Sequence, residues 1–308
     1  MLVTVVDDHR FRAMGTDCHV LAVDAPAGAV EAVEAQVRAD EDRWSRFLPT
    51  SELRRLAPGR THRLTPETAE LVALALDWQR RTDGRFDPRL GRHLRRLGYE
   101  TSFERVGGAP SAATDPPHAD LALDGDRLTV PAGVELDLGG IAKGHGADRA
   151  VALARSLGAT GACVNLGGDL RCAGDSPTGD GWWLALDHGD GAEASSLALG
   201  LAHGAVATST TERRRWTSAD GTEHHHLLDP RTGRPARTRC RAASVVAASG
   251  AAAEVLAKVV LLADPHDAAR LLDQHGAAAL ATGHDGRLHR LGALALHVVP
   301  AADLPEHP

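Results

Sequence analysis

The stretch Asp137-Leu-Gly-Gly-Ile-Ala-Lys-Gly-His-Gly-Ala-Asp148 gives the strongest structural signal in the chain. It begins inside a short apolar segment, residues 134–140, which we expect to form a strand. Glycines follow, and a helix is predicted over residues 146–158. A turn from a strand into a helix aims backbone N–H groups and the positive end of the helix dipole at an anion. The stretch therefore indicates a phosphate-binding turn, with a glycine-rich turn and a surface lysine as the alternative.

Four residues of this stretch suit a dinucleotide. Gly139 and Gly140 let a diphosphate approach the backbone because no Cβ stands in the way. Lys143 supplies a point charge for phosphate, and Asp137 can accept hydrogen bonds from a ribose or a base edge. The pattern is neither a Walker A loop nor the G-x-G-x-x-G fingerprint, since no Ser or Thr follows Lys143 and the glycine spacing differs.

Strand and helix patterns are mixed irregularly along the rest of the chain. Apolar spacing predicts helices over residues 27–47, 66–82 and 251–263. We expect strands within residues 11–24, 121–130, 161–174, 182–187, 196–209 and 280–292. Residues 104–119 are rich in Pro, Gly and Ala and are predicted to form a loop or a mobile insertion. Because strict strand-helix-strand alternation is missing, an α+β fold is favoured over a doubly wound sheet.

Composition restricts the class of protein. Hydrophobic residues make up 43% and charged residues 24% of the 308 residues, the balance of a soluble globular protein. A formal charge of −7 argues against nucleic acid as a partner, because a phosphate-backbone binder needs a basic face. The sequence has no apolar window of about 18 residues, so we expect no membrane span.

The N-terminus and the cysteines bear on location. MLVTVVDDHR lacks the basic region and long apolar stretch of a secretory signal or lipoprotein leader. None of Cys18, Cys163, Cys172 and Cys240 belongs to a C-x-x-C pair, so neither zinc nor a redox dithiol is indicated. We therefore expect a cytoplasmic protein with four buried, reduced thiols.

Residues 226–235, His-Leu-Leu-Asp-Pro-Arg-Thr-Gly-Arg-Pro, predict a turn with a candidate catalytic pair. Asp229 can cap the Asp-Pro-x-x-Gly turn with its side chain. His226 precedes it by three residues, near enough for the carboxylate to orient the ring for general-base work. His224 and His225 cannot join His226 around one metal on an extended chain, so no zinc site is predicted. A solvent-exposed polar loop is the alternative.

Two further patterns are weaker when taken alone. Asn165-Leu-Gly-Gly-Asp169 is more typical of a tight turn or a β-bulge than of a binding site. Glu254 and Lys258 are four residues apart on one face of the apolar helix predicted over residues 251–263. The ordinary interpretation of this pair is a helical ion pair worth roughly a few tenths of a kcal/mol.

Together and in this order, the segments resemble the FAD:protein FMN transferases, the ApbE family. They cover most of the chain, from about residue 11 to residue 264. The matching segments are Met14-Gly15-Thr16, Trp44-Ser45-Arg46-Phe47-x-Pro49-x-Ser51-Glu52-Leu53, Asp83-Gly84-Arg85-Phe86-Asp87-Pro88, residues 137–144, Asn165-Leu-Gly-Gly168, Ala207-Thr208-Ser209 and His226-Leu-Leu-Asp229-Pro-Arg-Thr-Gly233. One motif is only suggestive, whereas seven in sequence order identify the family.

The resemblance implies an α+β, T-fold-related single domain with two lobes and FAD in the cleft between them. We place this domain at residues 11–299, between an N-terminal extension, 1–10, and a Pro-rich C-terminal tail, 300–308. Family members cleave the FAD diphosphate and pass FMN to a Thr or Ser hydroxyl of a target flavoprotein, with release of AMP. Mg²⁺ assists by bridging the diphosphate. The implied partner is therefore a flavoprotein with an acceptor hydroxyl.

The family's site residues carry over to this chain position by position. The FAD-binding residues implied are Met14, Phe47, Arg85, Phe86, Asp87, Asp137, Lys143 and Leu228. The Gly140 carbonyl would face the metal. His226 would be the base that activates the acceptor hydroxyl, with Asp229 beside it.

Three positions depart from the family pattern. The family's magnesium ligands are an Asp and, four residues later, a Thr, where this chain has Glu254 and Lys258. An ammonium cannot coordinate a metal. We therefore hypothesise that Lys258 lies where the metal would, held by Glu254 and facing the diphosphate. Ala57 also stands where the family has an Asn that influences whether FMN is transferred or FAD is hydrolysed. An FAD pyrophosphatase that yields FMN and AMP, and a non-catalytic FAD-binding protein, are the alternatives.

Overall fold

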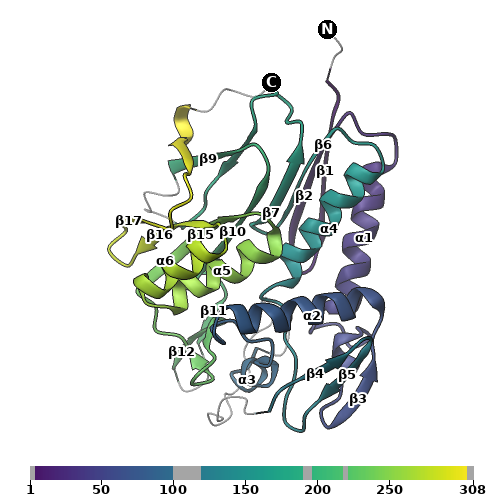
Figure 1. Cartoon of the computed structure of the whole chain (residues 1–308), viewed down its shortest axis with the longest axis vertical. Coiled ribbons are helices and arrows are strands. Elements are labelled where there is room, and N and C mark those ends of the chain that lie inside the picture. Colours follow the sequence, from purple (N-terminus) through teal and green to yellow (C-terminus); the bar gives the residue numbers. More distant parts are fainter. Residues whose placement is uncertain (1–3, 100–118, 190–195, 218–220, 304–308) are drawn as a thin grey trace. The chain divides into compact units, whose positions relative to one another are not determined.

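A computed structural model describes residues 4–99, 119–189, 196–217 and 221–303 (Figure 1). The chain divides into two compact units. Unit 1 comprises Met1–Ala39, Lys143–Thr210 and Arg239–Pro308, and unit 2 comprises Asp40–Ala142 and Thr211–Thr238. The loop predicted over residues 104–119 lies outside the described residues except for its last position.

Unit 1 is built on an eight-stranded sheet. Its strand order is β1-β2-β6-β7-β10-β15-β16-β17, and every neighbouring pair is antiparallel. The strands are β1 (Val6–Ala13), β2 (Thr16–Val23), β6 (Gly161–Leu166), β7 (Asp169–Gly174), β10 (Gly204–Thr210), β15 (Cys240–Ala247), β16 (Ala278–Gly283) and β17 (Leu288–Leu291). The antiparallel pairing confirms the α+β class.

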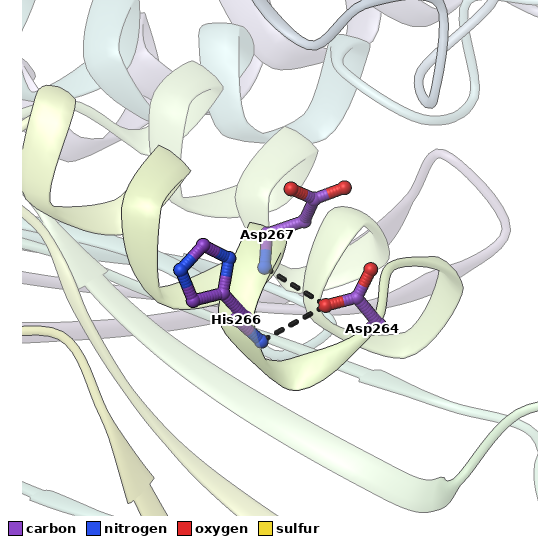
Figure 2. Close-up of side chains that lie close together, drawn as sticks. All are labelled: Asp264, His266 and Asp267. Atoms are coloured by element: carbon purple, nitrogen blue, oxygen red, sulfur yellow. Dashed lines mark hydrogen bonds between the residues drawn. The ribbon is translucent and has the colours of Figure 1, made fainter.

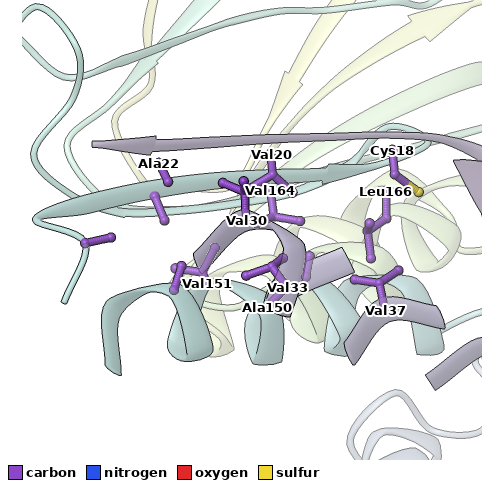
Figure 3. Close-up of a cluster of buried hydrophobic side chains, with 14 of the residues drawn as sticks. Cys18, Val20, Ala22, Val30, Val33, Val37, Ala150, Val151, Val164 and Leu166 are labelled. Atoms are coloured by element: carbon purple, nitrogen blue, oxygen red, sulfur yellow. The ribbon is translucent and has the colours of Figure 1, made fainter. Parts of the chain in front are cut away.

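Helices cover one face of this sheet. Helices α1 (Ala29–Trp44) and α4 (Ala142–Ser156) lie side by side against its N-terminal strands (Figure 1). Val33 of α1 and Val164 of β6 are fully buried in the cluster that the two helices share with the sheet (Figure 3). Further along the sheet, α5 (Gly250–Leu262) packs on β10 and β15, and α6 (Pro265–Gln274) packs beside α5. The alanines on these helices and strands allow close packing between them.

A three-stranded sheet covers the opposite face. Its order is β18-β9-β8, formed by β8 (Trp182–Ala185), β9 (Leu197–Leu201) and β18 (His297–Pro300). Trp182 and Leu199 pack with Val206 of β10 and Val246 of β15 in a second core cluster. The central strands are therefore buried on both faces over most of their length.

The N-terminus of α6 is capped by the side chain of the residue that precedes it, Asp264. Asp264 Oδ1 accepts the backbone N–H groups of His266 and Asp267, each at 3.0 Å (Figure 2). This cap draws the three side chains together at the surface. Because capping accounts for the grouping, we assign no metal to it.

Unit 2 contains a small sheet, helices and two hairpins. The sheet order is β3-β5-β4, from β3 (Arg60–Arg63), β4 (Ala122–Asp124) and β5 (Arg127–Val130). The helices are η1 (Leu53–Arg55), α2 (Pro66–Arg81) and α3 (Gly91–Arg96). The hairpins pair β11 (Arg215–Thr217) with β12 (Glu223–His225) and β13 (Leu228–Asp229) with β14 (Arg234–Pro235). Helix α2 begins at Pro66, as its start signal predicts.

Residues 11–24 do not form the single strand that their alternation predicts. They belong to a hairpin, in which β1 and β2 are joined at Met14 and Gly15. Both turn residues have left-handed backbone, with φ of 52° and 66°. Met-Gly is not among the common two-residue hairpin turns, so no turn signal in these residues predicts the break. Strand β1 starts at Val6, within the predicted N-terminal extension.

Three other predictions need correction. Residues 134–140 form no regular strand, and the one strand-like contact there is a bridge between Leu90 and Glu135. Helix α4 begins at Ala142, earlier than predicted, and so includes Lys143. Cys240 is only partly buried, unlike the other three cysteines.

The C-terminal segment is partly ordered. Pro300 ends β18, and Ala301–Asp303 form a short 3-10 helix (η4), so the predicted tail is ordered at its start. Within the described part of the chain, no helix combines the length and the apolar character needed to cross a membrane.

Candidate active site

The predicted site residues are divided between the two units, and the surroundings of each set are described in turn. The residues in unit 1 are Met14, Lys143, Glu254 and Lys258. The residues in unit 2 are Phe47, Arg85, Phe86, Asp87, Asp137, Gly140, His226, Leu228 and Asp229.

Two glycines bring α4 and α5 into backbone contact in unit 1. A Cβ on Gly144 would lie 2.2 Å from the Gly250 carbonyl oxygen, and a Cβ on Gly250 would lie 2.3 Å from the Gly144 oxygen. No side chain fits at either position without moving a helix. The close contact therefore requires glycine at position 144 in the first turn of α4, although glycine weakens a helix. The sequence-based start of α4 was wrong for this reason.

The two helices cap each other's N-termini with acidic side chains. Glu254 of α5 accepts the Gly144 N–H on Oε2 at 2.8 Å. Asp148 of α4 accepts the N–H groups of Gly250 at 2.7 Å and Ala251 at 3.1 Å. Burial raises the pKa of Asp148 in spite of these two bonds. Each carboxylate thus satisfies N–H groups that have no partner within their own helix.

Four charged side chains surround this crossing, and we call them the four-charge cluster: Lys143, Asp169, Glu254 and Lys258. Lys143 Nζ forms an ion pair with Asp169 and lies 3.5 Å from Glu254 Oε1. Lys258 Nζ donates to the same Oε1 and to the Glu254 carbonyl oxygen, both at 3.2 Å. The cluster carries two positive and two negative formal charges, so it is neutral overall.

Glu254 is the centre of this cluster and is only 1% exposed. Its burial acts to raise the pKa, but Lys143, Lys258 and the Gly144 N–H together hold the pKa below the ordinary value. The predicted helical ion pair with Lys258 is present, but its carboxylate is buried and is shared with Lys143. The side chains of Lys143 and Lys258 remain 15% and 16% exposed.

Met14 lies next to the start of α4. It packs against the cluster of buried side chains between the sheet, α1 and α4. Its Cε is 3.4 Å from the place where a Cβ on Gly146 would be. The hairpin turn between β1 and β2 therefore holds this flexible thioether over the first turns of α4.

In unit 2, the Arg46 guanidinium lies over two neighbouring aromatic rings, Phe47 and Tyr99, whose centres are 5.6 Å apart. Its guanidinium carbon lies 4.3 Å from the Phe47 ring centre and 4.0 Å from the Tyr99 ring centre. Nη1 donates to the Tyr99 carbonyl oxygen at 2.7 Å, and Nε is 3.9 Å from Asp137 Oδ2. Leu228 is buried in the same apolar cluster. The structure thus brings together Phe47, Asp137 and Leu228, which are far apart in the sequence.

Asp137 shapes the glycine turn that follows it. Its Oδ1 accepts the Gly139 N–H at 2.8 Å, and its own N–H donates to the Pro88 carbonyl oxygen at 2.8 Å. Gly140 lies in the same turn. One carboxylate oxygen of Asp137 therefore fixes the backbone, and the other faces Arg46.

The segment Arg85-Phe86-Asp87 is held tightly by its neighbours. Asp87 is largely buried and pairs with the Arg89 guanidinium, with Oδ2 to Nη2 at 2.8 Å. Phe86 is also buried, and its N–H donates to Thr82 Oγ1 at 3.1 Å. Arg85 Nη1 lies 3.6 Å from Asp83 Oδ2. The pairing with Asp87 raises the pKa of Arg89.

The His226 segment forms the hairpin turn that its sequence predicts. Asp229 Oδ1 accepts the Arg231 N–H at 2.9 Å, which confirms that Asp229 caps the turn. His225 Nε2 lies 3.0 Å from the Ala236 carbonyl oxygen, and burial lowers the pKa of this histidine. His224 packs on the Trp216 ring. The orientation of His226 by Asp229 stays a prediction, because the hydrogen bonds described for this carboxylate go to Arg231.

Sequence reasoning missed two pairs of residues. Asp169 and Asp148 were not predicted, because their partners lie on other elements and are too far away in the sequence for a spacing rule to pair them. Arg46 and Tyr99 were not proposed as binding residues, although Arg46 stands inside a quoted motif. A count of lysines would have pointed to the four-charge cluster, as described below.

A model of the ApbE family matches residues 14–281 of this chain. This range contains every predicted site residue. The chain belongs to the ApbE family.

Individual ApbE relatives agree with the family match. The FAD:protein FMN transferase of Rhodobacter capsulatus is 30% identical over 234 residues, which cover 73% of this chain and 44% of the relative. The FAD:protein FMN transferase of Klebsiella pneumoniae (strain 342) is 24% identical over 292 residues, 89% of this chain and 83% of the relative. The chain therefore spans less than half of the first relative and most of the second.

Solved ApbE structures have the same fold. The ApbE protein of Thermotoga maritima superposes with a TM-score of 0.83 and 28% identity, over 93% of this chain and 97% of the other. The apo form of the flavinyl transferase ApbE of Pseudomonas stutzeri gives a TM-score of 0.77 and 25% identity, over 97% and 96% of the two chains. The α+β fold expected from the resemblance is confirmed.

Proposed function

We propose that this chain is an FAD:protein FMN transferase, which moves FMN from FAD to a Thr or Ser hydroxyl of a target flavoprotein and releases AMP. The match to the ApbE family over residues 14–281 carries this proposal. Relatives of that name, aligned over 73% and 89% of the chain, support it.

His226 is the proposed general base. The acceptor hydroxyl oxygen attacks the phosphorus of the FMN half, and the bond from this phosphorus to the oxygen shared with AMP breaks. The hydroxyl proton passes to His226, and AMP leaves with the bridging oxygen. Asp229 supports this role by capping the turn that follows His226, with its Oδ1 2.9 Å from the Arg231 nitrogen.

The other site residues are proposed to bind FAD. In unit 2, the half-buried Phe47 ring, supported by Arg46 and the buried Tyr99 ring, offers flat apolar surface for a flavin or adenine ring. Arg85, Phe86, Asp87, Asp137, Gly140 and Leu228 would complete that part of the pocket. In unit 1, Met14, Lys143 and Lys258 would meet the dinucleotide, with the lysines at its diphosphate.

A direct assay separates this function from the alternatives. The purified protein is incubated with FAD and a peptide that carries one Thr, and AMP release and flavin attached to the peptide are followed. The expected result is equal amounts of AMP and flavinylated peptide. AMP with free FMN would instead establish an FAD pyrophosphatase, and FAD binding without AMP would establish a binding protein.

The matched control peptide carries Val at the acceptor position, because Val has nearly the shape of Thr without the hydroxyl. Flavin on the Val peptide would contradict transfer to a hydroxyl. His226→Asn tests the base: AMP release should fall while FAD binding remains.

A further inference from the structure

Lysine occurs only twice in this chain, and both lysines flank the same carboxylate. Lys and Arg together number 34, of which Lys143 and Lys258 are the only lysines. Their Nζ atoms lie 3.5 Å and 3.2 Å from Glu254 Oε1. Everywhere else the chain uses arginine, whose charge is spread over a planar fork, whereas an ammonium is a compact point charge. The chain therefore places its two compact positive charges beside one buried carboxylate, that of Glu254.

The residues here do not fit the magnesium ion that the ApbE family implies. A magnesium ligand needs an oxygen with a lone pair directed at the metal. Glu254 Oε2 accepts the Gly144 N–H at 2.8 Å, and Oε1 faces both ammonium groups. Lys258 offers protons in place of a lone pair. A divalent cation at Glu254 would have to displace a cation from one oxygen and a helix N-terminus from the other.

We propose that Lys258 takes the electrostatic part of a divalent cation in this protein: with Lys143 it binds the FAD diphosphate, so FAD binding requires no magnesium. This inference rests on the proposed function, because it assumes that FAD is the ligand. It goes further by naming the groups that bind the diphosphate and by excluding a metal requirement.

The charges and hydrogen bonds of the cluster support this role. Asp169 and Glu254 already balance the two lysines within the unit, so the ammonium groups are held in place before any ligand arrives. Two of the three N–H groups of Lys258 donate to Glu254, at 3.2 Å each, which leaves the third for an anion among the contacts described. Fixed cations of this kind stabilise charge without reorganisation.

The test measures FAD dissociation constants by isothermal titration calorimetry, with EDTA and with Mg²⁺. Wild-type protein should bind FAD equally well in both buffers. Riboflavin, which has no phosphate, serves as the matched ligand. A dissociation constant for FAD that is about tenfold lower with Mg²⁺ would overturn the inference, since a tenfold change exceeds ordinary ionic-strength effects on a partly buried pair. Absence of FAD binding in both buffers would instead refute the proposed function.

Substitutions test the lysine itself. Lys258→Met should weaken FAD binding about tenfold or more, because it removes a charge-assisted hydrogen bond. It should leave riboflavin binding unchanged. Arg270→Met is the matched control, since it removes a positive charge from an exposed position on α6. Equal FAD affinity of Lys258→Met and wild type would contradict the inference.

The double variant Glu254→Asp, Lys258→Thr covers the case in which Lys258→Met does not fold. It restores oxygen ligands at both positions, and its FAD binding should depend on Mg²⁺. A double variant that binds FAD as tightly with EDTA as wild type does would count against Lys258 as the replacement.

Acylation of amines gives an independent readout in the wild-type protein. Only Lys143, Lys258 and the N-terminal amine can react, so mass spectrometry can follow each one. Saturating FAD in EDTA should protect both lysines and leave the N-terminal amine reactive. Reaction of Lys258 at the same rate with and without FAD would overturn the inference.

Discussion

Lowering the pH from 7.5 to 5 is expected to reduce the free energy of unfolding by about 2 kcal/mol through one residue, His188. The ring is only 1% exposed. Its Nδ1 lies 2.7 Å from Thr282 Oγ1 and its Nε2 lies 2.7 Å from Ser244 Oγ. Ser244 Oγ is in turn 2.6 Å from Thr208 Oγ1. The neutral ring therefore belongs to a buried network of hydroxyl groups on the large sheet.

The magnitude follows from the difference between the folded and unfolded states. Burial lowers the pKa of His188 from 6.5 to about 4 in the folded protein, with Asp187 opposing and Arg241 assisting the shift. Between these two values the unfolded chain binds a proton that the folded chain does not. The stabilisation is thus complete above pH 6.5 and is lost as the pH falls toward 4. At pH 5 the loss is about 2 kcal/mol, and below pH 4 it approaches about 3 kcal/mol.

Urea unfolding followed by circular dichroism at several pH values between 7.5 and 5 measures this effect. His188→Asn keeps a neutral donor and acceptor but cannot titrate. This variant should be less stable than wild type at pH 7.5 and should lose about 2 kcal/mol less on acidification. His203→Asn, which replaces an exposed histidine, is the matched control. Parallel pH curves for wild type and His188→Asn would refute the reasoning.

Three further predictions concern the helix crossing and the reaction. Gly144→Ala should lower stability by about 2 kcal/mol or more, because its Cβ meets the Gly250 backbone. Gly146→Ala, which meets only the ends of side chains at 3.3 Å and beyond, should not, and thermal unfolding of both variants decides. Asp148→Asn should cost about 1 kcal/mol, since the cap of α5 loses its charge; an unchanged midpoint would show that the cap contributes nothing. His226→Asn should lower the rate of FMN transfer about a hundredfold with FAD affinity unchanged, and full activity would exclude His226 as the base.

Local signals in the sequence determined several elements correctly. Pro66 starts α2, Asp-Gly turns join β4 to β5 and mark the β16–β17 hairpin, and the apolar run of α5 is a buried helix. These predictions succeeded because each rests on contacts between near neighbours in the chain, through turn chemistry or helical spacing. The family also followed from the sequence, since the order of several motifs is itself sequence information.

Contacts between distant segments decided the rest. The start of α4 at Ala142 depends on Gly250, more than a hundred residues away, because only two glycines let these helices touch. The state of Glu254 depends likewise on Lys143 and on the Gly144 N–H, not only on Lys258 in its own helix. Spacing placed Glu254 and Lys258 on one face, but burial turned that pair into the centre of a neutral cluster. Residue identity and local spacing therefore determined which groups this protein has, and tertiary packing decided which charges meet, because burial and the proximity of distant charges arise only in the folded chain.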